Sequence, residues 1–174
     1  ELYDLSRDLA SAANLESILN VLQKHLEQTF NRTIAVLLPE SNKLIPSALS
    51  KGMLLNEEEL AVADWVYRHA EPAGRHTNTL PAAQLRYLPL RTSKGVIGVL
   101  GIGKANTSDS DLSPAQRRLM EAFANQGAQA IERAQLEEQN RQIALLQSAE
   151  KLQNTLLNSI SHDLRTPLVA ITGA

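Results

Sequence analysis

The clearest structural signal in the sequence is residues 85–103, L-R-Y-L-P-L-R-T-S-K-G-V-I-G-V-L-G-I-G. Two apolar runs, 85–91 and 96–103, flank the polar stretch T-S-K-G at 92–95, in which Gly occupies the last position of a β-turn. Runs rich in Leu, Val and Ile on both sides of such a turn are typical of an antiparallel hairpin. The stretch therefore predicts two paired strands.

The glycines of this stretch allow a second interpretation, a phosphate-binding loop. They stand at positions 95, 98, 101 and 103. This spacing lacks the order G-x-G-x-x-G, and no helix is predicted directly after it. We therefore expect the glycines to permit close packing within a sheet.

Working outward from the hairpin, periodicity predicts three helices and two more strands. Apolar residues recur at helical spacing in the helices and form short continuous runs in the strands. Pro46 favours an edge or a bulge for the strand that contains it. The predicted helices are 1–12, 15–30 and one that starts after Asn56; the strands are 33–38 and 43–50, and 71–84 is a polar loop.

Capping residues support three of the helix starts. Asn14 precedes the second helix, and Asn56 with Glu59 forms a capping-box pattern before the third. The same pattern precedes the last helix, where Ser113 is followed by Pro114 at the first helical position and by Gln116.

From Pro114 to Pro167 only Gly127 interrupts the helical pattern. A helix of this length far exceeds the average in globular proteins. Its apolar stripe cannot be buried against one small domain, so we expect a partner helix, most simply its copy in a parallel homodimer.

The order helix, helix, strand, strand, helix, strand, strand, long helix indicates an α+β domain with an antiparallel sheet. With its Y-L-P-L and G-V-I-G-V-L-G strands, the sequence resembles a GAF domain. The resemblance implies a central antiparallel sheet, terminal helices on one face and a ligand pocket on the other. Candidate pocket residues are Trp65, Arg75, His76 and Tyr87. For Trp65, as for Tyr67, a core or rim position is favoured over ligand stacking, and for Arg75, His76 and Tyr87 a solvated loop stays open as the alternative. The signature of cyclic-nucleotide GAF domains is absent.

Composition excludes several classes of function. The chain has 174 residues, 43% of them hydrophobic, a net charge of −2 and no Cys. Disulfides, thiol chemistry and a thioether-bound tetrapyrrole are therefore excluded. The sequence also lacks the dense basic run that is typical of nucleic-acid binding. No apolar run approaches the ~20 residues of a membrane span. Because the first residue is Glu, we expect a piece of a longer protein.

Residues 159–168, S-I-S-H-D-L-R-T-P-L, resemble the phosphoacceptor box of sensor histidine kinases. Helical spacing places Leu156, Leu157, Ile160, Leu164, Leu168 and Ile171 on one apolar stripe, with Asn158, Ser161, His162 and Arg165 on the outward face. A neutral imidazole exposed there can attack a γ-phosphate through one ring nitrogen. Pro167 removes the N–H that would bond the Asp163 carbonyl, which predicts a bend after His162.

The resemblance implies that His162 accepts phosphate, Asp163 accepts the proton and Thr166 positions water during dephosphorylation of a partner. The residues of the box and of the upstream hairpin resemble those of a potassium-responsive branch of these kinases. A response regulator would then be the partner, ATP and Mg²⁺ would be bound elsewhere in the parent, and this chain would be a cytoplasmic part of an inner-membrane protein. We expect no metal site and no kinase activity in this chain alone.

The implied domains are a GAF-like sensor, 1–112, a terminal helix and coiled-coil linker, 113–155, and the first phosphoacceptor helix, 156–174. An alternative stays open. The chain could be a ligand-binding or dimerising module in which the phosphoacceptor box has no role.

Overall fold

The structure is a computed structural model that describes residues 1–105 and 110–172. The chain divides into two compact units, residues 1–134 and 135–174. The elements are α1 (Leu2–Ser11), α2 (Leu15–Phe30), β1 (Arg32–Glu40), β2 (Lys43–Leu49), α3 (Glu57–His69), β3 (Ala73–Gly74), β4 (Arg86–Thr92), β5 (Gly95–Ala105) and α4 (Pro114–Thr172).

The first unit contains a five-stranded antiparallel sheet with the order β2-β1-β5-β4-β3. The predicted hairpin of residues 85–103 supplies β4 and β5, which pair from Arg86 opposite Ile102 to Thr92 opposite Gly95. Gly95 has a φ of 119°, a conformation that favours glycine. The predicted α+β architecture is therefore confirmed.

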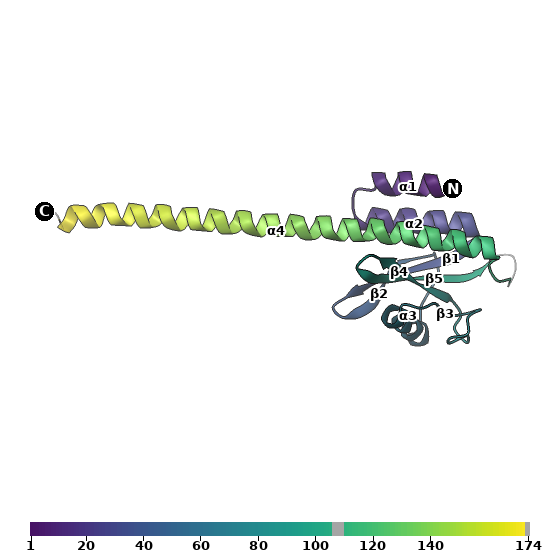
Figure 1. Ribbon diagram of the computed structural model, residues 1–174. Coiled ribbons are helices and arrows are strands. Elements are labelled where there is room, and N and C mark those ends of the chain that lie inside the picture. Colours follow the sequence, from purple (N-terminus) through teal and green to yellow (C-terminus); the bar gives the residue numbers. More distant parts are fainter. Residues whose placement is uncertain (106–109, 173–174) are drawn as a thin grey trace. The chain divides into compact units, whose positions relative to one another are not determined.

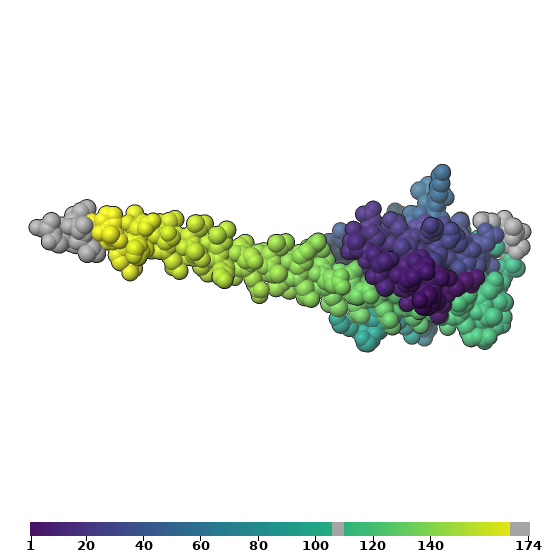
Figure 2. All heavy atoms as spheres, turned by 90° about the horizontal axis from the view of Figure 1, so that it is seen from above, coloured from purple at the N-terminus to yellow at the C-terminus, as the bar shows by residue number. Residues whose placement is uncertain are grey.

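Helices cover both faces of the sheet in the first unit (Figure 1). On one face, α1, α2 and the first part of α4 enclose a core that includes Leu22, Leu100 and Phe123. Phe30 and Phe123 meet edge to face, with ring centroids 5.7 Å apart. Figure 2 looks onto this helical layer, with α1 in purple and the first part of α4 in green. On the other face, α3 covers a smaller core around Val66 and Tyr87.

Pro46 lies where the sequence predicted it. β2 is an edge strand, and its pairing with β1 shifts register between Val36 and Leu37, the latter opposite Pro46. A missing N–H is tolerated at an edge or a bulge because no ladder hydrogen bond is lost.

Two of the three predicted helix caps form as expected. The Asn14 side chain accepts from the Ser17 N–H at 2.8 Å. At the start of α4, the Ser113 hydroxyl accepts from the Gln116 N–H at 3.2 Å, and the Gln116 side chain accepts from the Ser113 N–H at 2.9 Å. This last pair is a complete capping box.

The capping box predicted at α3 is half wrong. Asn56 does accept from the Glu59 N–H at 2.9 Å. The Glu59 carboxylate, however, turns away from Asn56 and accepts from the backbone N–H groups of Gln84 and Leu85, just before β4. The carboxylate is needed there because the Leu85 N–H would otherwise be buried without an acceptor.

The glycines of β5 permit close packing, as predicted. A Cβ at Gly98 would lie 2.7 Å from the Leu37 carbonyl oxygen, and one at Gly101 would lie 2.9 Å from the Tyr87 ring. Neither approach leaves room for a side chain.

The segment 71–84 differs from the predicted loop in one respect. It contains the short strand β3, which pairs with Arg86 and Tyr87 of β4. Gly74 has a φ of 97°, and a Cβ there would lie 2.2 Å from the Leu85 carbonyl oxygen. Only glycine permits this turn and this approach, so a strand forms in an otherwise polar stretch.

In the second unit, residues 135–172 are helical. The large apolar side chains described in this unit are exposed in the single chain, among them Leu145, Leu146, Leu152, Leu156, Leu157, Ile160 and Leu164. None of the helices, over the described residues, combines the length and apolar character that crossing a membrane requires.

Candidate functional site

The predicted phosphoacceptor lies in the second unit, on α4. The side chains of His162 and Asp163 are 81% and 80% exposed, and His162 Nδ1 lies 3.7 Å from Asp163 Oδ1. This separation exceeds a hydrogen bond but is short enough for one ring nitrogen to face the carboxylate while the other is open to solvent. A phosphate donor could therefore approach the imidazole without displacing another side chain.

Thr166 lies one turn beyond His162. Its hydroxyl donates to the His162 carbonyl oxygen at 3.2 Å. Such a bond competes with the helix backbone and often accompanies a bend. Pro167 lies inside α4, which continues to Thr172, and it offers no N–H to the Asp163 carbonyl. Two irregular backbone interactions therefore lie next to His162 and Asp163.

The predicted apolar stripe is described through Leu164. Leu156, Leu157, Ile160 and Leu164 are between 53% and 62% exposed. The side chains of Leu168 and Ile171 lie outside the described residues. Half-exposed leucines and isoleucines at helical spacing are typical of a surface that packs against another helix.

A second candidate site lies in the first unit, between α3 and the segment before β4. It is a cavity of about 190 Å³ whose lining includes Asn56, Glu59, Val62, Leu80 and Gln84. The Glu59 carboxylate at its base is 5% exposed. It accepts from the Gln84 N–H at 2.7 Å, the Leu85 N–H at 3.3 Å and the Tyr87 hydroxyl at 2.7 Å.

Tyr87, a predicted pocket candidate, is fully buried in the core of this unit. Burial, together with the hydrogen bond to Glu59, raises the pKa of its hydroxyl well above the usual range. Its polar atom is thus engaged by Glu59. Sequence reasoning missed this pair because Glu59 stands at the position of a capping residue.

The other three candidates lie at different places on the first unit. Trp65 is half-buried and stacks on His69, with ring centroids 4.2 Å apart. Arg75 and His76 follow β3, and the Arg75 Nε–H donates to His76 Nε2 at 3.1 Å. Over the described residues, no group of three or more His, Asp or Glu side chains could hold a metal ion.

The connection into α4 is anchored by arginines. Arg32 donates to the carbonyl oxygens of Gly103 and Ser110 at 3.2 and 2.5 Å. Arg86 lies 3.6 Å from the Asp111 carboxylate, which also bonds Arg117. Burial lowers the pKa of the Arg32 and Arg86 guanidinium groups. These bonds tie the start of α4 to the end of the sheet.

Further along α4, two contacts within the first unit join it to distant segments. The Thr92 hydroxyl at the β4–β5 turn donates to Glu132 at 3.0 Å. Arg133 donates to the Leu9 carbonyl oxygen of α1 at 3.2 Å. No sequence pattern indicated these contacts, since they join residues far apart in the chain.

The five-stranded antiparallel sheet with helices on both faces is the fold of a GAF domain. Residues 14–133 match the GAF domain family, and the chain belongs to that family. Across its whole length the chain matches sensor protein KdpD. It is 34% identical to KdpD of Escherichia coli over 173 residues, covering 99% of this chain and 19% of that protein. It is 29% identical to KdpD of Clostridium acetobutylicum over 181 residues, covering 99% and 20%.

The native GAF domain of the potassium sensor histidine kinase KdpD from Escherichia coli has the same fold. It superposes with a TM-score of 0.70 at 30% identity, covering 80% of this chain and 96% of that one. The predicted resemblance to this branch of kinases is therefore confirmed. The chain spans about one fifth of the length of the KdpD relatives.

Proposed function

We propose that this chain is the sensor and signalling region of a two-component sensor histidine kinase that controls potassium transport genes. The observation that carries the proposal is that one helix, α4, holds both the last segment of the GAF domain and the exposed pair His162–Asp163. The match to KdpD over 99% of the chain supports the same conclusion.

In the proposed reaction, a nitrogen of the neutral His162 ring attacks the γ-phosphorus of ATP. The N–P bond forms as the bond from phosphorus to the β,γ-bridging oxygen breaks, and ADP leaves. The ring loses its other proton, which Asp163 accepts directly or through water. Another domain of the parent supplies ATP and Mg²⁺. The phosphoryl group then passes to an Asp of a KdpE-like response regulator.

Thr166 and Pro167 have supporting roles in this proposal. The Thr166 hydroxyl would position water when the phosphorylated regulator is dephosphorylated. Pro167 would bend the helix one turn beyond His162, because the Asp163 carbonyl has no donor at that position. A bend there alters how the phosphoacceptor turn is presented to its donor and to its acceptor.

The signal would reach the helix through the β4–β5 turn. Thr92 bonds Glu132 of α4, and Lys94 lies 3.9 Å from the same carboxylate. A ligand that changes the position of β4 would change these contacts and shift α4 between two arrangements in a homodimer. The exposed stripe from Leu145 to Leu164 is the surface we assign to the partner helix.

We further propose three segments within the parent. Residues 1–112 are the GAF sensor with its N-terminal helices, 113–155 are the terminal helix and coiled-coil linker, and 156–174 begin the phosphoacceptor domain. The chain would lie on the cytoplasmic side of an inner-membrane protein.

The test uses the full-length kinase with γ-labelled ATP. We expect His162→Gln to abolish labelling, while His69→Gln, which changes an exposed His of α3, leaves it at the wild-type level. Asp163→Asn should slow labelling by roughly 10²-fold or more, the contribution typical of a proton acceptor. Undiminished labelling of the His162→Gln kinase would refute the proposal.

The chain by itself should not label, because ATP would be bound elsewhere in the parent. We expect no phosphate on the isolated 174 residues with ATP and Mg²⁺. Adding the ATP-binding domain in trans should restore labelling of wild-type chain only. Label on the chain without that domain would contradict this division of labour.

A second function, ligand binding or dimerisation without phosphotransfer, is favoured by the cavity of about 190 Å³ beside Glu59. It predicts that kinase activity is unchanged by His162→Gln and that the purified chain retains a small molecule. Native mass spectrometry of the chain would detect such a molecule and report the number of copies at the same time.

A further inference from the structure

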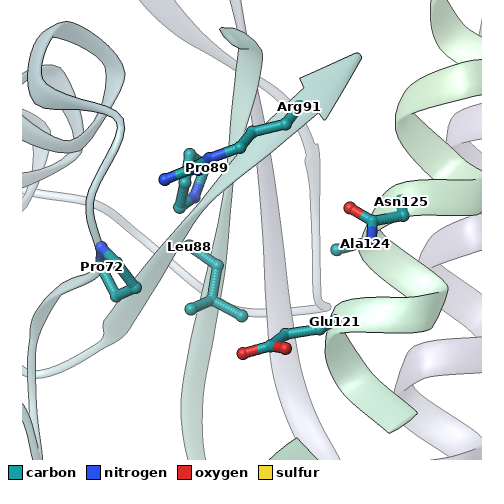
Figure 3. A pocket seen from close by; sticks show the side chains of 7 residues that line it. All are labelled: Pro72, Leu88, Pro89, Arg91, Glu121, Ala124 and Asn125. Carbon is teal, nitrogen blue, oxygen red and sulfur yellow. The ribbon is translucent and has the colours of Figure 1, made fainter. Parts of the chain in front are cut away.

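A second cavity lies beside β4 and shares no lining residue with the cavity beside Glu59. Its volume is about 360 Å³, within the range of small-molecule sites. The cavity lies between β4 and the first part of α4, both in the first unit (Figure 3). It exists because β3 pairs only with Tyr87 and Arg86, so the second half of β4 has no neighbouring strand on that side.

The floor of this cavity is apolar. Leu88 and Ala124, 7% and 3% exposed, form it together with Pro72 and Pro89. Pro89 has no N–H, so at this position the open edge of β4 is poorly suited to receive another strand. A compact molecule with an apolar middle fits this floor better than an extended peptide does.

The walls carry two opposite charges. Arg91 and Glu121 lie on opposite sides of Leu88, and Asn125 lies beside Glu121 on α4 (Figure 3). Within the part of the chain that the structure describes, neither Arg91 nor Glu121 forms a hydrogen bond or an ion pair. Glu121 acts on the charge of Arg86, and that guanidinium is already paired with Asp111 at 3.6 Å.

We propose that this cavity binds a small zwitterion whose ammonium and carboxylate are separated by an apolar spacer, such as an ω-amino acid or a dipeptide. Arg91 pairs with the carboxylate, Glu121 and Asn125 hold the ammonium, and the spacer lies over Leu88. Opposite charges that face one cavity without neutralising each other suit a ligand that carries both signs.

The inference goes beyond the proposed kinase role and does not depend on it. It bears on that role because Thr92, next to Arg91 in β4, bonds Glu132 of α4. A ligand that holds β4 and α4 together would act on the same strand and helix that we assign to signalling.

The experiment is an NMR titration of the ¹⁵N-labelled 174-residue chain with 6-aminohexanoate, hexanoate and hexylamine. We expect saturable shifts of the Leu88, Arg91, Ala124 and Asn125 amides with 6-aminohexanoate. Hexanoate and hexylamine each lack one charge and should bind roughly tenfold more weakly, the effect of one charged hydrogen bond.

Two variants and two controls complete the test. Arg91→Gln should weaken 6-aminohexanoate binding roughly tenfold and leave hexylamine binding unchanged. Glu121→Gln should also weaken 6-aminohexanoate binding roughly tenfold, but it should leave hexanoate binding unchanged. The matched exposed changes Arg118→Gln and Glu16→Gln should have no effect. Absence of saturable shifts, equal binding of a single-charge probe, or equal weakening by the controls would overturn the proposal. The titration involves no kinase activity, so its failure leaves the proposed function untouched.

Discussion

At the residue scale, Glu59 shows how a local rule can be overridden by tertiary structure. Three residues after Asn56, an acid is expected to close a capping box. Instead, its carboxylate is buried and accepts from two backbone N–H groups and the Tyr87 hydroxyl. The half of the motif that depends on local backbone was predictable. The other half depends on β4, which lies about 25 residues away, so sequence spacing could not indicate it.

We expect Glu59→Ala to destabilise the fold by about 2–4 kcal/mol, because the buried Leu85 N–H and Tyr87 hydroxyl and the part-buried Gln84 N–H would lose their acceptor. Urea unfolding followed by circular dichroism measures the effect. Glu58→Ala removes an exposed acid from the same turn and should change the free energy of unfolding by about 0.5 kcal/mol or less. Equal effects of the two variants would show that the Glu59 bonds contribute nothing.

The raised pKa of Tyr87 predicts a loss of stability at high pH. The hydroxyl stays protonated in the fold, while in the unfolded chain it ionises near pH ~10. Stability is therefore complete below that pH and should fall by up to about 1.4 kcal/mol per pH unit above it. Tyr87→Phe should remove this part of the slope. Identical slopes for both proteins in urea unfolding between pH 9 and pH ~11 would be inconsistent with this account.

The roles that we propose for His162 and its neighbours follow from the sequence alone, because the chemistry is local to one turn of helix. Those of Arg91 and Glu121 do not. The two residues belong to different elements, and each alone looks like an ordinary surface charge. Only the fold places them at one cavity.

At the scale of elements, helix starts and the β4–β5 hairpin followed closely from capping residues and periodicity. β3 did not, because two residues are too few for any periodic pattern, and its pairing depends on the backbone freedom of Gly74. The three later glycines of β5 were correctly attributed to close packing rather than to phosphate binding.

The packing of β5 predicts that Gly98→Ala destabilises the domain by about 1–3 kcal/mol, since the new methyl group would press on the Leu37 carbonyl oxygen. Thermal unfolding measures the change. Because backbone rather than a flexible side chain is in contact, relaxation cannot relieve it cheaply. A variant as stable as the wild type would show that β1 and β5 are less tightly packed than described.

At the scale of the whole molecule, the sequence predicted both the GAF fold and a last helix that is too long to be buried against one small domain. The apolar side chains of that helix are exposed in the single chain. The second copy that we propose as their partner is therefore tested by the oligomeric state of the chain.

If the stripe joins two copies, the double change Leu157→Asp and Ile160→Asp should convert a dimer into a monomer, since two charges would replace buried apolar contacts. The control double change Asn158→Asp and Ser161→Asp introduces two Asp residues on the outward face of the helix and should leave the dimer intact. Analytical ultracentrifugation of the chain separates the two results. Equal mass for both double variants would exclude this stripe as the interface.

The most direct measurement is the position of the phosphate in the full-length kinase after incubation with ATP and Mg²⁺. Tandem mass spectrometry under conditions that preserve the acid-labile N–P bond can assign it to a single residue. We predict phosphate on the His162 imidazole, absent when ATP is omitted. Phosphate on another residue with His162 unmodified would contradict the proposal that this turn of α4 is the phosphoacceptor.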